Sequence, residues 1–222
     1  MKKAIVLLSG GMDSAVTLFM ARKDHDVEAL IFDYGQKASK EVDRAILVAG
    51  AAKVPYTVVD VELPWRGSSL TDPDIAIPTA EESEGAKIPS TYVPARNIIF
   101  LSYGVSLAEA SGAEAVYIGA HQVDYSNYPD CRDVFFAGFR KTVEAGTRSG
   151  TEGASIRIET PILNFSKGDI VKKGVELGVP FELTWSCYDE GKTPCGRCES
   201  CVLRAKGFAD ALVPDPLLAK NE

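Results

Sequence analysis

The feature that most constrains the fold is an apolar run near the amino terminus that stops at a short polar loop and then resumes. The run covers residues 4–8 without a polar interruption, which favours a strand buried on both faces, as in a parallel sheet. After the loop, apolar residues from Ala15 to Met20 recur with helical spacing. The sequence therefore predicts a strand, a turn and a helix in that order.

The turn has the composition of an anion-binding loop. Its sequence, Ser9-Gly10-Gly11-Met12-Asp13-Ser14, offers hydroxyl groups and unshielded backbone N–H groups at the positive end of a helix. The spacings G-x-x-x-x-G-K-[ST] and G-x-G-x-x-G of other nucleotide loops do not occur here. The alternative is an ordinary strand-to-helix turn, in which Asp13 or Ser14 caps the helix.

The same strand and helix pattern repeats along the chain. Residues 27–33 and 56–61 read as buried strands, with a helix through Lys53 between them. This βαβαβ pattern predicts right-handed crossovers and a ligand site at the carboxyl ends of the strands. Residues 115–120 and 155–160 read as further strands, and residues 96–111 and 135–146 as helices. We therefore expect an α/β fold with a parallel sheet of about five strands and helices on both faces.

Length and charge limit the classes of partner. A chain of 222 residues with 45% apolar residues can hold one large domain and an appendage, which we place at residues 1–180 and 181–222. No apolar stretch reaches membrane-spanning length, so we expect a soluble, cytoplasmic protein without a membrane partner. The net charge of −7 argues against binding to nucleic acid, which usually requires a basic surface.

Residues from Leu63 to Pro94 are rich in proline, glycine, serine and threonine, which excludes long regular elements. A loop of this length inside a compact domain is usually functional or mobile. We expect a partly ordered flap near the nucleotide, and a solvated insertion without a role is the alternative.

Arg96 opens the predicted helix at residues 96–111. A cation in the first turn of a helix is disfavoured unless an anion neutralises it. We favour a carboxylate or phosphate of a ligand over a surface salt bridge as that anion.

Lys167 is a second cation at a helix amino terminus, because it follows Ser166, the expected N-cap of a later helix. It could contact a triphosphate or remain on the solvated surface.

The predicted fourth strand leads into a stretch that is dense in hydrogen-bonding and aromatic groups. Loops in this position of α/β folds hold substrates. Tyrosine rings stack on a flat heterocycle, carboxylates accept hydrogen bonds from its N–H groups, and a cation meets an acid substituent. The candidate residues are His121, Asp124, Tyr125, Tyr128, Asp130 and Arg132.

Four cysteines near the carboxyl terminus have the spacing C-x7-C-x2-C-x2-C. Four thiolates in so compact a motif suit tetrahedral Zn²⁺ with a structural role, since no position is left open for catalysis. An iron–sulfur cluster and disulfides are the alternatives. The expected ligands are Cys187, Cys195, Cys198 and Cys201.

The loop from Ser9 to Ser14 resembles the SGGxDS signature of the ATP pyrophosphatase, or PP-loop, superfamily. Several further blocks are similar to the 7-cyano-7-deazaguanine synthase family of queuosine biosynthesis, across nearly the whole chain. These blocks are residues 33–36, 92–97, 119–132 and 167–170, together with the four cysteines.

The resemblance implies a Rossmann-like fold of the adenine nucleotide alpha hydrolase type and a set of site residues. The nucleotide loop would grip the β and γ phosphates of ATP, with Mg²⁺ held by Asp13. Residues expected to bind ATP are Leu8, Ser9, Gly10, Gly11, Met12, Asp13, Ser14, Phe32 and Tyr34. Residues expected to act in catalysis are Ser14, Asp13, Arg96 and Lys167, and Tyr92, Arg96 and Asn97 join the substrate-binding set.

The resemblance also implies the reaction. ATP would adenylate 7-carboxy-7-deazaguanine, ammonia would displace AMP to give an amide, and a second activation would leave a nitrile. The chain has no length for a glutaminase domain, so free ammonia is the expected nitrogen donor. A homodimer is the expected assembly. A tRNA-thiolating PP-loop enzyme and a non-enzymatic module are the rival interpretations, and the acidic net charge disfavours the first.

Overall fold

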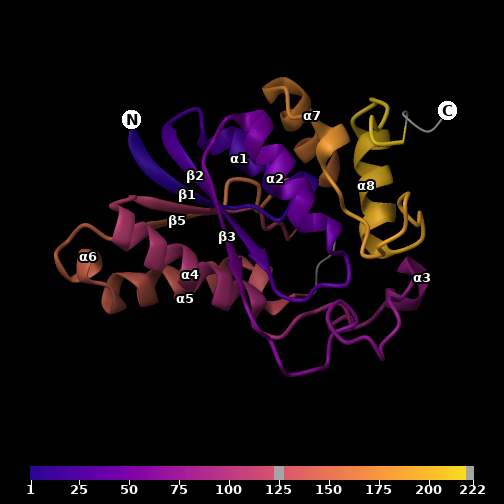
Figure 1. Ribbon diagram of the computed structural model, residues 1–222, viewed down its shortest axis with the longest axis horizontal. Helices are drawn as coiled ribbons and strands as arrows, with labels where there is room; N and C mark the ends of the chain where they lie inside the picture. Colours follow the sequence, from indigo (N-terminus) through magenta and orange to yellow (C-terminus); the bar gives the residue numbers. More distant parts are fainter. Residues whose placement is uncertain (123–127, 219–222) are drawn as a thin grey trace.

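The structure, a computed structural model, describes residues 1–122 and 128–218. Its centre is a parallel sheet of five strands in the order β3-β2-β1-β4-β5 (Figure 1). The predicted Rossmann-like α/β fold is thereby confirmed. The strands are β1 (Lys2–Leu7), β2 (His25–Asp33), β3 (Tyr56–Asp60), β4 (Ala115–Ile118) and β5 (Arg157–Glu159).

Helices cover both faces of the sheet because the central strand buries side chains on both. Ile5 and Leu7 join one core cluster, and Val6 and Leu8 join the other. The first cluster includes residues of α4 (Arg96–Ser111) and α5 (Asp133–Gly146), with the short α6 (Arg148–Thr151) after them. The second includes residues of α1 (Met12–Ala21), α2 (Lys40–Ala52) and α7 (Lys167–Leu177). Figure 1 shows the two helical layers on opposite sides of the sheet.

The predicted helix at residues 96–111 agrees with α4, whereas β4 is two residues shorter than the predicted strand at 115–120. The chain leaves the sheet at Gly119, where it passes close to the start of α1. A Cβ atom at Gly119 would lie 2.8 Å from the backbone nitrogen of Ser14. Close packing of two backbones therefore ends this strand and brings residues 119–122 beside the nucleotide loop.

The proline-rich segment between β3 and α4 contains one helix in the structure, the four-residue α3 (Ala80–Ser83). The segment contacts other parts of the chain at several points. Lys37 donates from its backbone to Leu70 O at 2.8 Å, and Ala80 donates to Arg197 O at 2.9 Å. The expected absence of long regular elements is confirmed.

The carboxyl-terminal part packs at the end of the sheet away from the amino terminus (Figure 1). It comprises a 3₁₀ turn, η2 (Phe181–Leu183), the four cysteines and α8 (Glu199–Asp210). α8 makes its most extensive contacts with α7. The division into domains at residues 1–180 and 181–222 stays a prediction. Within the described residues, no helix is both long and apolar enough to cross a bilayer.

Candidate active site

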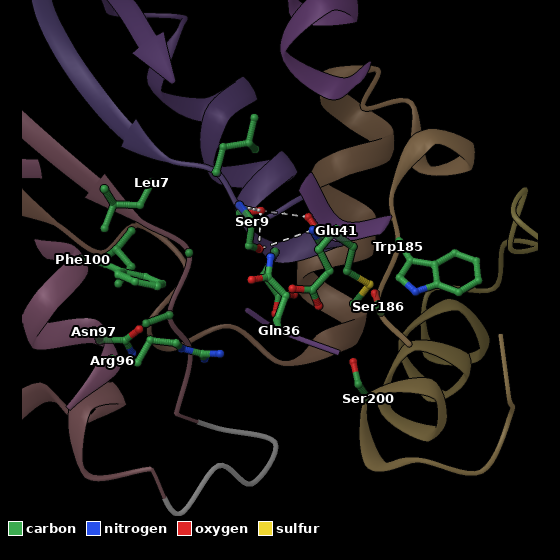
Figure 2. Close-up of a pocket in the computed structure, with 18 of the residues that line it drawn as sticks. Leu7, Ser9, Gln36, Glu41, Arg96, Asn97, Phe100, Trp185, Ser186 and Ser200 are labelled. Carbon is green, nitrogen blue, oxygen red and sulfur yellow. Dashed lines mark hydrogen bonds between the residues drawn. The ribbon is translucent and has the colours of Figure 1, made fainter. Parts of the chain in front are cut away.

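A cavity of about 250 Å³ opens at the carboxyl ends of β1, β2 and β4. Its wall is formed by the loop before α1, the first turns of α2 and α4, and residues of α8 (Figure 2). The position agrees with the ligand site expected for an open parallel sheet. The predicted site residues that line it are Leu8, Ser9, Gly11, Met12, Asp13, Ser14, Phe32, Tyr34, Arg96, Asn97, His121, Tyr128 and Lys167.

The Ser9 loop is held in shape by its own hydroxyl groups. The Ser9 backbone N–H donates to Ser14 Oγ at 3.1 Å, and Ser14 Oγ donates to Gly11 O at 3.1 Å. Gly11 is the N-cap of α1 and has no side-chain cap, so the alternative in which Asp13 or Ser14 caps the helix is wrong. Gly10 has a φ of 81°, which favours glycine. The backbone N–H groups at the start of α1 are thus left for a ligand.

Asp13 forms the charged centre of the cavity. Its Oδ2 lies 2.6 Å from Lys167 Nζ and 3.6 Å from His121 Nδ1. Its Oδ1 is buried and has no hydrogen-bond partner among the described residues. Burial raises the pKa of Asp13, but the charges of Lys167 and His121 outweigh that effect and hold the pKa below its usual value. Asp13 is therefore an ionised carboxylate with one oxygen available to a ligand or a cation.

Arg96 is the first residue of α4, as predicted, and its guanidinium points into the cavity (Figure 2). Its Nη1 donates to Tyr34 Oη at 3.0 Å. No carboxylate of the described residues lies within ion-pair distance of it. Burial lowers the pKa of Arg96. Interactions with Tyr34, Tyr128 and Glu41 raise it by more than burial lowers it, so the pKa is above the usual value of arginine. Arg96 is thus a permanent cation at a helix amino terminus, where an anion is favoured.

Asn97 and Asp130 form a buried pair at the start of α4. Asp130 Oδ2 accepts the Asn97 backbone N–H at 3.0 Å, and Asp130 O accepts Asn97 Nδ2 at 3.1 Å. Asp130 therefore caps α4 from a distant loop, where Ala95 has no side-chain acceptor. Its carboxylate is already hydrogen-bonded, and it does not line the cavity.

Three other predicted residues also lie outside the cavity lining. Tyr92 Oη accepts the Ala95 backbone N–H at 3.0 Å and so holds the turn before α4. Arg132 is exposed and donates from Nε to Pro129 O at 3.3 Å. Gly10, within the loop, faces α2 and not the cavity, and a Cβ there would come 2.4 Å from Glu41 O. Asp124 and Tyr125 lie outside the described residues. The ATP-binding role of Gly10 and the substrate-binding roles of the other four residues stay predictions.

The structure adds cavity residues that the sequence analysis did not select. Glu41, in the first turn of α2, points into the cavity between Ser9 and Ser186 (Figure 2). Burial raises the pKa of Glu41 to about 7, although the charge of Arg96 opposes the shift. The signal for Glu41 was its place five residues after the block at residues 33–36, but an acidic residue in a first helical turn is common. The carboxyl-terminal part contributes Trp185, Ser186, Tyr188, Glu199, Ser200, Leu203 and Arg204.

The four predicted metal ligands come together. All four sulfur atoms lie within 4.8 Å of one another, and Cys131 is not among them. Sulfur ligands of a tetrahedral zinc lie about 3.8 Å apart, so small adjustments would bring these into coordination. Backbone N–H groups of Asp189 and Cys195 both donate to Cys187 Sγ at 3.3 Å, which suits a thiolate. The cluster could bind a metal such as zinc, and every cysteine is free of a disulfide.

Comparisons with known proteins find similarity over nearly the whole chain. The model of a family described as queuosine biosynthesis protein QueC matches residues 3–212. A 7-cyano-7-deazaguanine synthase from Desulfitobacterium hafniense is 47% identical, over 100% of this chain and 95% of that protein. Another from Stenotrophomonas maltophilia is 50% identical, over 98% of this chain and 99% of that protein. A third from Acaryochloris marina is 48% identical, over 97% of this chain and 98% of that protein.

Proposed function

The chain belongs to the QueC family of queuosine biosynthesis proteins, and we propose that it converts 7-carboxy-7-deazaguanine and ammonia into 7-cyano-7-deazaguanine at the expense of ATP. It is accordingly a ligase that forms carbon–nitrogen bonds. The observation that supports the proposal is that the Ser9 loop and Arg96 line one cavity, where the loop would bind phosphate and Arg96 would bind the substrate carboxylate. The tRNA-thiolating alternative is not favoured, because the relatives are named as synthases of the deazapurine nitrile.

A carboxylate is a poor electrophile and has to be activated before an amine attacks it. In the proposed sequence, a carboxylate oxygen of the substrate attacks the α phosphate of ATP, and pyrophosphate leaves. Ammonia then attacks the acyl carbon, AMP leaves and a proton is released, which gives the amide. The amide oxygen then attacks the α phosphate of a second ATP, and pyrophosphate leaves. Loss of AMP and protons from the adenylated amide gives the nitrile.

The residues of the cavity would act by positioning and charge neutralisation. Backbone N–H groups of the Ser9 loop would hold the departing pyrophosphate. Lys167 would neutralise negative charge that develops on it, and Arg96 would bind and orient the substrate carboxylate. Phe32 and Phe100 stack on each other, with ring centroids 4.0 Å apart, and both line the cavity. They give the cavity an aromatic wall against which a flat heterocycle would pack.

Two cations are proposed with different roles. Asp13 fits a Mg²⁺ ligand, since its Oδ1 is a buried oxygen without a partner among the described residues and Mg²⁺ prefers carboxylate oxygens. Mg²⁺ would supply charge neutralisation on the phosphates of ATP. Zn²⁺ at the four cysteines would be structural, because the protein fills all four positions. We also propose a homodimer, which light scattering on the purified protein would test.

The function is tested by supplying purified protein with the acid, Mg·ATP and ¹⁵N-ammonium. The expected product is the deazapurine nitrile, one mass unit heavier than with natural ammonium, together with AMP and pyrophosphate. Absence of the nitrile in mass spectrometry would reject the proposal. A parallel reaction with glutamine in place of ammonium should give little product, and full activity there would overturn ammonia as the donor.

A further inference from the structure

The carboxyl-terminal part of the chain holds the nucleotide loop directly through Trp185. The Trp185 backbone N–H donates to Gly10 O at 2.9 Å, and its side chain is only 1% exposed. On its other side, Gly10 packs so closely on the start of α2 that a Cβ would come 2.4 Å from Glu41 O. The middle of the loop is therefore clamped between α2 and Trp185, and a shift of Trp185 would change the loop.

The first turns of α2 fix the indole of Trp185. Lys40 Nζ and Arg44 Cζ lie 5.0 and 5.8 Å from its ring centroid, within the range of cation–π attraction. Lys40 also donates to Gly191 O at 2.6 Å, and Arg44 to Glu182 O at 3.3 Å. The segment around Trp185 is thus attached to the same helix that supports the loop (Figure 2).

Arg204 ties this segment to α8. It is 4% exposed and donates from Nη1 to Thr184 Oγ1 at 2.7 Å, and from Nη2 to Phe181 O at 3.1 Å. Arg204 Nη1 also donates to Ser186 Oγ at 3.4 Å. Two further bonds, at 2.6 and 2.9 Å, connect the guanidinium to Asp215. α8 has Cys198 as its N-cap and carries Cys201. The helix that holds Thr184 in place therefore begins inside the cysteine cluster.

Two routes thus connect the cysteines to Gly10. One runs from Cys187 along two residues of backbone to Trp185. The other runs from Cys198 and Cys201 through α8 and Arg204 to Thr184. Metal bonds hold such a knuckle in one conformation, and their loss lets it relax.

We propose that metal bound by the four cysteines fixes Trp185, and through it Gly10, so that metal occupancy and nucleotide affinity are coupled. Trp185 is then a positioning residue for the Ser9 loop. The coupling is reciprocal, because a nucleotide that binds the metal-loaded form more tightly must also raise the affinity for metal by the same factor. The inference depends on ATP binding and not on the conversion of an acid into a nitrile.

The first test uses Trp185 as its own reporter. The chain has two tryptophans, and Trp65 is 50% exposed, so the Trp65→Phe variant leaves Trp185 as the sole source of tryptophan fluorescence. This protein is freed of zinc with a selective chelator and returned to magnesium buffer. Binding of α,β-methylene-ATP, which cannot be cleaved between its α and β phosphates, is then measured by calorimetry.

Metal removal should shift the Trp185 emission to the red and weaken binding of the analogue by about 5- to 150-fold, the usual range for coupled sites. Far-UV circular dichroism should keep the signal of the α/β sheet. Equal affinity with and without metal would overturn the proposal. As the reciprocal measurement, the analogue should slow zinc release to a chromogenic chelator, and an unchanged rate would also contradict it.

A second test keeps the metal in place and remains decisive if the metal-free protein unfolds. Thr184→Val preserves the shape of a fully buried side chain but removes its bonds with Arg204 and Phe181. Thr17→Val is the matched control, since Thr17 is also 0% exposed and its hydroxyl has no partner among the described residues. With full zinc content in both, only Thr184→Val should lose affinity for the analogue, by about fivefold or more. Equal affinities of the two variants would refute the coupling.

Discussion

Asp13 and Lys167 lie 154 positions apart in the sequence, yet Asp13 Oδ2 and Lys167 Nζ are 2.6 Å apart beside the nucleotide loop. Each residue is in the first turn of its helix, Asp13 in α1 and Lys167 in α7. The pair places an anion and a cation where two helix amino termini meet. Lys167 is unfavourable at its own helix terminus, but Asp13 compensates for that charge.

Replacing Lys167 should lower both the activity and the stability of the protein. Lys167→Met should slow ATP–pyrophosphate exchange by about 10²- to 10³-fold, the cost of removing one preorganised charge donor. It should also lower the free energy of unfolding, because Asp13 loses the partner of a largely buried pair. Urea unfolding and pyrophosphate exchange measure the two effects.

The double variant Asp13→Asn with Lys167→Met should recover part of that stability and none of the activity, since no unpaired charge remains. Lys173→Met in the same helix is the control, because Lys173 forms an exposed ion pair with Glu176. An activity loss as large in Lys173→Met as in Lys167→Met would contradict the role given to Lys167.

The two arginines that the sequence offered for the substrate acid should behave differently. Arg96 lines the cavity, whereas Arg132 is exposed and bonded to Pro129 O. Arg96→Gln should raise KM for 7-carboxy-7-deazaguanine by the equivalent of about 2–5 kcal/mol, the cost of removing one partner of a buried charge pair. Arg132→Gln should leave KM within about twofold, since exposed charges contribute little. Steady-state kinetics decide, and a larger effect at Arg132 would reverse the assignment.

Asp130 should matter for stability more than for substrate affinity. Its carboxylate caps α4 through the Asn97 backbone N–H, so Asp130→Ala should lower the free energy of unfolding by about 1–3 kcal/mol. Asp133→Ala, at an exposed position in the first turn of α5, is the control and should cost less. Chemical denaturation of both variants, with KM measured alongside, tests this. If Asp130→Ala raises KM as much as Arg96→Gln without destabilising the protein, Asp130 binds substrate after all.

The sequence predicts best those sites whose residues lie close together in the chain and form a recognisable motif. The Ser9 loop follows an uninterrupted apolar strand, and the four cysteines lie within 15 residues of one another, so spacing alone indicated both sites. The contact of Asp130 with the start of α4 could not be predicted, because a carboxylate in a polar loop looks the same whether it meets a ligand or a helix end 33 residues away. Trp185 was missed for a related reason, since its contact with Gly10 depends on how the tail folds back on the sheet.

A cluster of charged residues around Glu114 lies at the end of the sheet opposite the cavity. Glu114 accepts a hydrogen bond from Lys2 Nζ at 2.5 Å and from Arg157 Nη2 at 3.0 Å, and His25 Nε2 lies 3.3 Å from it. Bonding to Lys2 and Arg157 lowers the pKa of Glu114 to about 2. A carboxylate with a depressed folded pKa stabilises the protein above its unfolded value of 4.5 and loses that contribution as pH falls toward the folded value. Glu114→Gln should therefore be less stable than the parent at neutral pH, and the difference should shrink below about pH 4.5.

Urea unfolding at a series of pH values from about 7 down to 3 measures this difference. Glu84→Gln is the control, because Glu84 is exposed and has no ion pair among the described residues. Activity at neutral pH should be the same in both variants, since the Glu114 cluster is at the amino ends of the strands and the cavity is at their carboxyl ends. A stability difference that stays constant or grows as pH falls would mean that the Glu114 carboxylate is not held ionised by Lys2 and Arg157.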